Sequence, residues 1–201
     1  FENRVIYKKK MLAVEREIEE LKNAKDKNLA ELHQKQNQRS HYDAMQQAFK
    51  IALNSLYGAT GCPYFRYFNT NIAEGITLTG QYVSRRIGAR VNDFLNEKFY
   101  TTGEDYLIAG DTDSIYLDFN TLVEKVIPPN TPTDKIVDFL DKFVKKYVDP
   151  FIAGEFKKMA EYLNFIKDTL SMKREAIADK VIWRGKKNYI LQVYDNEGVR
   201  Y

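Results

Sequence analysis

The chain has 201 residues, a formal net charge of +3 and 44% hydrophobic residues. This size and composition suit a globular protein with one good-sized core or two small subdomains, and they exclude a disordered chain. The lone cysteine, Cys62, excludes an internal disulfide framework and favours a reducing, cytoplasmic environment. No apolar run approaches the length of a membrane span, so we expect no membrane partner.

The first part of the chain predicts an antiparallel helical hairpin. Residues 3–36 are highly charged and lack glycine and proline. Their apolar residues recur at helical spacing: Met11, Val14, Ile18 and Leu21. We expect a polar break at 38–40, then a second helix over 42–57 that the following glycine ends. For residues 10–40 alone, a plain coiled coil without chemistry is the preferred interpretation.

The remaining elements predict an α+β fold, in which a small antiparallel sheet is flanked by helices. An extended connection over 59–72 leads to a third helix with apolar positions Ile76, Val83, Ile87, Val91 and Leu95. Strand-like runs at 106–109 and 114–118, joined by 110–113, indicate a β-hairpin. Helices are expected at 134–147 and 151–164, and strands near 169–172, 181–183 and 189–194.

The turn of that predicted β-hairpin holds a pair of acids, Asp111 and Asp113, on either side of Thr112. Aspartate is ordinary at a turn, because its side chain caps local backbone groups. Two carboxylates held together on a rigid ribbon repel each other, however, and a hard cation such as Mg²⁺ relieves that repulsion. The hairpin therefore favours a metal site.

A second group of candidate residues lies on the predicted helix over 42–57. Lys50, Asn54 and Tyr57 stand at positions i, i+4 and i+7, so they share one helix face, while Met45, Phe49, Ala52, Leu53 and Leu56 can pack inward. A cation, an amide and an aromatic hydroxyl suit phosphate, sugar and base. A solvated polar face is an equally good interpretation of this stripe alone.

Several other charged residues are open to two interpretations. Arg4 and Lys8 share a helix face and either add cations beside Lys50 or are ordinary solvated surface. Glu175 is either a third carboxylate near the hairpin or a partner for a neighbouring lysine. The basic run at 186–187 before Tyr189 either grips a nucleic-acid backbone or forms an exposed turn.

Taken in order, these segments resemble family B DNA polymerases, most closely the replicative enzymes of T-even-like bacteriophages. The family's helix signature, Lys-x3-Asn-Ser-x-Tyr-Gly, matches Lys50 to Gly58. Its turn signature, Tyr-Gly-Asp-Thr-Asp-Ser, matches 109–114, except that Ala109 replaces the tyrosine. The Lys-Lys-x-Tyr element matches 186–189, and the resemblance covers nearly the whole chain.

The resemblance implies a role for each candidate residue. Arg4, Lys8 and Lys50 would hold the dNTP phosphates, with Asn54, Tyr57 and Gly58 facing the nucleotide and nascent base pair. Asp113 would be the principal metal ligand, supported by Asp111 and Glu175. Thr112, Lys186, Lys187 and Tyr189 would contact primer–template DNA. Asp111, Asp113 and Lys50 would be catalytic, in attack of a primer 3′-hydroxyl on the α-phosphate with two Mg²⁺ ions.

The resemblance also implies that residues 1–61 form the fingers and 62–201 part of the palm. Another metal-binding aspartate, the exonuclease and the thumb of the family have no counterpart here, so we expect the isolated chain not to polymerise. The expected partners are primer–template DNA, dNTP, a complementing N-terminal portion and thumb, and a sliding clamp reached through regions outside this chain. The expected location is cytoplasmic, in the host if the source is viral.

Two other functions stay open. A non-catalytic nucleic-acid-binding module would bind primed DNA with steep salt dependence but show no metal-dependent nucleotide binding. A structural helical-hairpin protein would use residues 10–57 for assembly, and its paired acids would be incidental.

Overall fold

The computed structural model describes residues 1–24, 28–111, 113–167, 169–185 and 187–201. These residues form two compact units: unit 1 comprises Phe1–Ala73 and Ala176–Tyr201, and unit 2 comprises Glu74–Glu175. Helices and antiparallel sheet are both present, which confirms the α+β class, but the strands form two sheets instead of one. The predicted fingers–palm boundary after residue 61 is a different division and stays a prediction.

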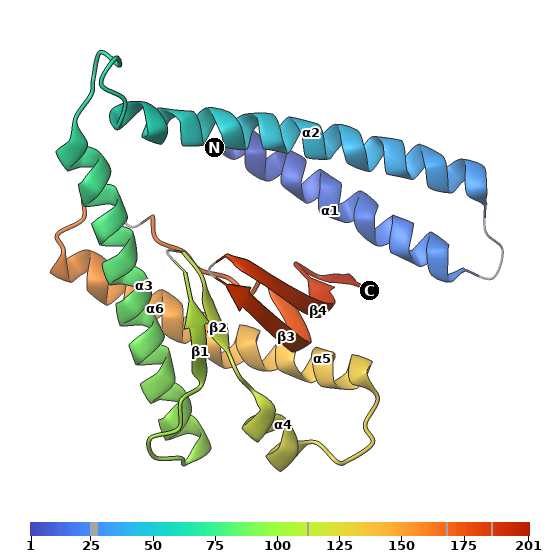
Figure 1. Ribbon diagram of the computed structural model, residues 1–201. Helices are drawn as coiled ribbons and strands as arrows, with labels where there is room; N and C mark the ends of the chain where they lie inside the picture. The colour runs from blue at the N-terminus through green and yellow to red at the C-terminus, as the bar shows by residue number, and fades with distance from the viewer. Residues whose placement is uncertain (25–27, 112, 168, 186) are drawn as a thin grey trace. The chain divides into compact units, whose positions relative to one another are not determined.

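Unit 1 contains the predicted helical hairpin, formed by α1 (Glu2–Asn23) and α2 (Leu29–Thr60), which lie side by side (Figure 1). The predicted apolar stripe is real, since Met11, Val14 and Ile18 are buried. Ion pairs join the two helices, including Lys35 Nζ to Glu17 Oε2 at 2.5 Å and Arg39 Nη2 to Glu15 Oε1 at 3.5 Å.

The predicted break at Gln38–Ser40 is wrong, because α2 runs through these residues without interruption. They include neither glycine nor proline, and a polar residue at an exposed helix position does not end a helix. The true start of α2 is set by Asn28, whose side chain accepts a hydrogen bond from the Glu31 backbone N–H at 3.3 Å. At its other end α2 passes Gly58 and stops at Thr60, so the expected end at Tyr57 was also too early.

The predicted inward packing of the last turns of α2 is also wrong. Ala52, Leu53 and Leu56 are exposed, and 65% of the Leu56 surface is accessible. The cause is the register of the hairpin: Tyr7 stacks on Phe49 with ring centroids 5.9 Å apart. Because α1 begins only a few residues before Tyr7, the last turns of α2 extend past its start and α1 does not cover them.

Unit 1 also contains a three-stranded antiparallel sheet of β3 (Ala176–Gly185), β4 (Asn188–Asn196) and β5 (Val199–Arg200). β3 and β4 confirm the strands expected near 181–183 and 189–194, and both are longer than predicted. The strand expected near 169–172 is wrong. Its apolar residues Leu170 and Met172 instead pack against the core of unit 2 without pairing in a ladder.

Unit 2 is built on α3 (Thr70–Phe99), whose first residues belong to unit 1. The connection before it was predicted to be extended over 59–72, which is wrong. It spans 61–69 and is a series of turns, in which the Phe65 N–H donates to the Cys62 carbonyl at 3.0 Å and the Phe68 N–H to the Phe65 carbonyl at 2.9 Å. Val83, Ile87, Val91 and Leu95 of α3 are buried as predicted, whereas Ile76 is 52% exposed. This buried face packs against the aromatic and aliphatic side chains of the following helices, among them Phe143, Phe156 and Met159.

The rest of unit 2 is a β-hairpin followed by helices. β1 (Leu107–Gly110) and β2 (Ile115–Leu117) pair antiparallel, which confirms the predicted hairpin. The short helix α4 (Asn120–Val126) was not predicted. The two expected helices are present as α5 (Thr133–Phe143) and α6 (Asp149–Tyr162), but a π-helical turn, η1 (Val144–Val148), joins them without a gap. Pro150, which has no backbone N–H to donate, stands in the first turn of α6, directly after this π-helical turn.

Candidate nucleotide and metal site

The paired acids lie where β1 turns into β2. The Asp111 backbone N–H donates to the Ser114 carbonyl at 2.9 Å, which closes a tight turn. The Asp118 N–H donates to the Tyr106 carbonyl at 2.8 Å and closes the opposite end of the hairpin. Asp111 and Asp113 are both exposed, so solvent or a ligand can reach each residue. Thr112, the candidate DNA contact between them, lies outside the described residues.

The third predicted acid, Glu175, immediately precedes β3 and is exposed. Within the described residues there is no group of three histidine, cysteine, aspartate or glutamate side chains arranged to hold a metal ion. Asp111 and Asp113 therefore share a turn, but Glu175 does not complete a three-carboxylate cluster with them. Two aspartates still fit Mg²⁺, which binds through one or two carboxylates and takes its other oxygens from water and substrate phosphates.

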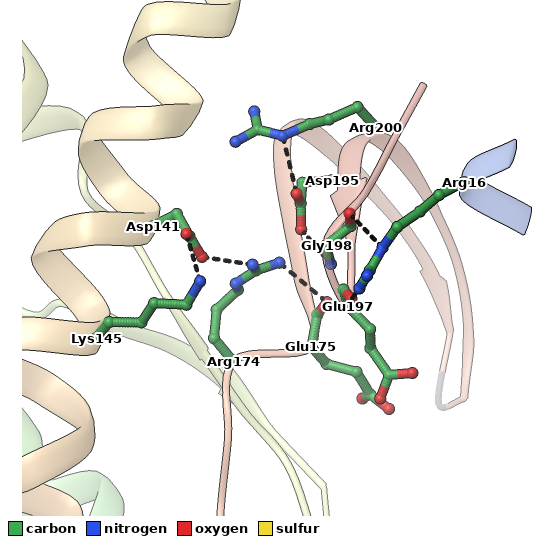
Figure 2. A network of polar contacts seen from close by, with 9 residues as sticks. All are labelled: Arg16, Asp141, Lys145, Arg174, Glu175, Asp195, Glu197, Gly198 and Arg200. Atoms are coloured by element: carbon green, nitrogen blue, oxygen red, sulfur yellow. Dashed lines mark hydrogen bonds and ion pairs between the residues drawn. The ribbon is translucent and has the colours of Figure 1, made fainter. Parts of the chain in front are cut away.

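A partly buried ion pair holds the backbone at Glu175 (Figure 2). Arg174 Nη2 donates to Asp141 Oδ1 at 2.5 Å, and Arg174 Nη1 contacts the Glu175 carbonyl at 3.4 Å. Lys145 binds the other oxygen of Asp141 at 2.7 Å. Burial raises the pKa of Asp141, but the hydrogen bonds from Lys145 and Arg174 outweigh it and leave that pKa below its usual value. Sequence reasoning missed Asp141, because nothing in the sequence distinguishes it from the other acids on a charged helix face.

Asp149 lies near the same cations as Asp141, but its pKa is shifted in the opposite direction. Burial raises its pKa above the usual range, and the nearby positive charges of Arg174 and Lys145 only partly offset that effect. The contrast has a simple cause: Asp141 receives direct hydrogen bonds from two cations, whereas Asp149 feels them only through space.

The predicted stripe on α2 is present and accessible. Lys50, Asn54 and Tyr57 are all exposed, and 42% of the Tyr57 surface is accessible. At Gly58 the space around the backbone is open, because a Cβ placed there would meet no atom within 4 Å. The stripe can thus meet a ligand along more than one helical turn.

The two α1 cations differ in their surroundings. Lys8 Nζ forms an ion pair with Glu197 Oε1 at 2.6 Å. Arg4 is half-buried, and its Nε has no hydrogen-bond partner in the part of the chain that the structure describes. Sequence reasoning missed Glu197, which lies far from Lys8 in the chain.

The third group of candidates lies on the β3–β4 hairpin. Lys187 is exposed and has a positive φ of 61°, as a tight hairpin turn requires. Tyr189 pairs with Trp183 across the strands, with ring centroids 5.0 Å apart. Both rings are about 40% exposed, so Trp183 adds an aromatic surface that sequence reasoning did not single out. Lys186 lies outside the described residues.

The candidate residues divide between the two units. Asp111, Asp113 and Glu175 belong to unit 2, and the stripe, the α1 cations and the β3–β4 hairpin belong to unit 1. Among the described residues, no helix combines the length and apolar character needed to cross a bilayer.

Comparison with known proteins identifies the family. The pattern of DNA polymerase family B matches residues 15–128, which is more than half of the chain. The chain therefore belongs to DNA polymerase family B. This confirms the resemblance that the two signatures carried, and it includes the segment with Lys50, Asn54, Tyr57, Asp111 and Asp113.

Individual relatives place the chain more closely. It is 42% identical over 161 residues to the DNA-directed DNA polymerase of Escherichia phage RB69, and 36% identical over 161 residues to that of Enterobacteria phage T4. Each match covers 76% of this chain but only 18% of the phage protein. A third relative, DNA polymerase 1 of Sulfolobus acidocaldarius, is 33% identical over 125 residues, which are 62% of this chain and 11% of that protein. The chain is thus T4-like and spans about a fifth of the length of its phage relatives.

Proposed function

We propose that this chain is part of a DNA-directed DNA polymerase that transfers dNTP to a primer 3′-hydroxyl with two Mg²⁺ ions. The observation that carries the proposal is the β1–β2 turn, which presents Asp111 and Asp113 to solvent in a chain of family B. Residues 1–61 would act as fingers and 62–201 as part of the palm.

The chemistry of the exposed groups supports separate roles. Asp111 and Asp113 would hold Mg²⁺, which supplies charge stabilisation for the attacking and leaving oxygens. Glu175 would support them from the start of β3. Lys50 and Lys8 would neutralise the phosphates as point charges, and Arg4 would do so as a planar fork. Asn54, Tyr57 and Gly58 would line the sugar and base side of the nucleotide.

The partners follow from the same proposal. Primer–template DNA would contact Thr112, Lys186, Lys187 and Tyr189, through phosphates for the lysines and stacking for the tyrosine. Catalysis would need a complementing N-terminal portion and thumb, and a sliding clamp would act through those regions. The reaction would take place in the cytoplasm of a bacterial host.

Metal binding gives the first test, with Mn²⁺ as a spectroscopic probe for Mg²⁺. We expect Asp111→Asn and Asp113→Asn each to weaken Mn²⁺ binding by about tenfold, because each removes one of two carboxylate ligands. Glu124→Gln removes an exposed charge on α4 and is the matched control. Equal Mn²⁺ affinity in all four proteins would refute the metal assignment.

Primer extension tests the need for other segments. The isolated chain should extend no primer, and extension should appear only when a complementing polymerase polypeptide is added. Robust synthesis by the chain alone would contradict this expectation. Salt-sensitive DNA binding without metal-dependent dNTP binding would instead support the non-catalytic binding module.

A further inference from the structure

The ion pair of Lys8 connects α1 to the turn between β4 and β5, two segments at opposite ends of the chain. Lys8 Nζ lies 2.6 Å from Glu197 Oε1, and the two side chains are 34% and 25% exposed. The pair is therefore accessible to a ligand but partly shielded from solvent. Lys8 is one of the cations proposed to receive the nucleotide phosphates, and in this structure it pairs with a carboxylate that the phosphates would have to displace.

The turn that carries Glu197 is rigidly built. Glu197 and Gly198 have φ of 51° and 84°, the left-handed pair typical of a two-residue hairpin turn. Asp195, which is 1% exposed, accepts a hydrogen bond from the Gly198 N–H at 3.0 Å and an ion pair from Arg200 at 3.0 Å. The position of Glu197 is thus fixed by the fold of the turn.

A second contact from α1 holds the same turn (Figure 2). Arg16 donates to the Gly198 carbonyl from Nε at 3.1 Å and to the Glu197 carbonyl from Nη2 at 3.2 Å. Arg16 lies eight residues after Lys8, about two helical turns further along the same side of α1. Arg16 therefore holds the backbone of the turn, and the Glu197 carboxylate pairs with Lys8.

We propose that Glu197 is a resident counter-ion of Lys8 that competes with nucleotide phosphates for this cation. The inference rests on the proposed function of Lys8. Glu197 weakens phosphate binding in two ways: it occupies the ammonium group, and its own negative charge repels an incoming polyphosphate. When the phosphates bind, Lys8 exchanges one anion for another, while Arg16 keeps α1 on the turn.

The test is calorimetric binding of tripolyphosphate and of dTTP to the full chain without divalent metal. Glu197→Gln should lower both dissociation constants by about two- to fivefold, the range expected for a partly exposed ion pair. Lys8→Ala should raise them. Adding Glu197→Gln to Lys8→Ala should then lower them by a smaller factor than in the original chain, because only the repulsion by Glu197 is left to remove. Glu20→Gln, which removes the same charge from an exposed position on α1, should change neither constant.

A second variant, Glu197→Asp, keeps the test decisive if Glu197→Gln fails to fold. Glu197→Asp keeps the charge but withdraws the carboxylate by one methylene, so it should change the dissociation constants in the same direction by a smaller factor. If Lys8→Ala weakens binding while both Glu197 variants bind as the original chain does, the competition is wrong and the nucleotide role of Lys8 stands. If Lys8→Ala has no effect on binding, the proposed function of Lys8 itself is wrong.

Discussion

Gly198 shows at the scale of one residue how backbone geometry and a neighbouring side chain combine. Its φ of 84° is left-handed, and a Cβ placed there would lie 3.0 Å from Arg16 Nη2. Gly103 has a similar φ of 74° but open space around it, which makes it a matched control. The two glycines thus separate the cost of the backbone from the cost of the contact.

We expect Gly103→Ala to lower the free energy of unfolding by about 1 kcal/mol, the penalty for a left-handed alanine. Gly198→Ala should cost about 2 kcal/mol, because Arg16 must also move away from the turn. Urea denaturation followed by circular dichroism measures both. Equal losses for the two variants would show that the contact with Arg16 adds nothing.

Glu155 is a single residue that should make stability depend on pH. Its side chain is 5% exposed and lies 2.7 Å from Lys158 and 3.2 Å from Arg90. The hydrogen bond from Lys158, with that from Arg90, lowers the pKa of Glu155 below its ordinary 4.5 despite burial. A lowered folded-state pKa contributes stability above pH 4.5 that is lost as the pH falls through the folded value.

We therefore expect Glu155→Gln to be less stable than the original chain at pH 7 by about 1 kcal/mol. The difference should shrink as the pH falls below 4.5, because the original chain then loses its ion pairs. Thermal unfolding across that pH range checks this, with Glu161→Gln, an exposed acid on the same helix, as the control. A difference that stays constant with pH would contradict the assignment.

At the scale of elements, the start of α2 depends on one capping residue. The Asn28 side chain accepts from the Glu31 N–H at 3.3 Å and donates to the Glu31 carboxylate at 3.3 Å. Asn28→Ala should lower the free energy of unfolding by about 1 kcal/mol. Asn37→Ala, at an exposed position inside the same helix, should be neutral or slightly stabilising because alanine favours helix. A larger loss at Asn37 than at Asn28 would refute the cap.

The same cap shows why element boundaries were harder to predict than elements. The helical spacing of apolar residues was enough to predict α3 and the buried stripe of α1, because such spacing is a strong signal in the sequence. The start of α2 needed a local signal, Asn28 with Glu31, and the polar residues near Gln38 were wrongly preferred to it. The strand expected near Thr169 failed because a short apolar run can pack into a core without pairing.

The candidate site also has parts that the sequence predicted and parts that it did not. The turn with Asp111 and Asp113 and the stripe from Lys50 to Tyr57 lie within single elements, so spacing was enough to predict that their members share a surface. The contact of Lys8 with Glu197 and that of Arg174 with Asp141 join residues far apart in the chain. Such pairs depend on tertiary packing, which helical or strand periodicity does not encode.

At the scale of the whole molecule, unit 1 is assembled from both ends of the chain, and all of unit 2 lies between its two segments. The hairpin α1–α2 consequently gains its contacts with β5 only after the C-terminal residues have been added. Contacts of such large sequence separation carry a high entropic cost of loop closure. We therefore expect the contact between α1 and β5 to form late in folding.

The net charge of the whole chain, only +3, predicts how it should bind DNA. Such a small net charge gives only a weak overall field. The salt dependence of DNA binding should therefore come from individual contacts with phosphates. Lys187→Ala should therefore reduce the slope of log K against log salt by about 0.9, the value for one lost phosphate contact on duplex DNA. Lys22→Ala removes the same charge from the far end of α1 and should leave the slope unchanged. Fluorescence anisotropy with a labelled primer–template measures both slopes, and an equal reduction in the two variants would show that total charge, and not the β3–β4 hairpin, governs binding.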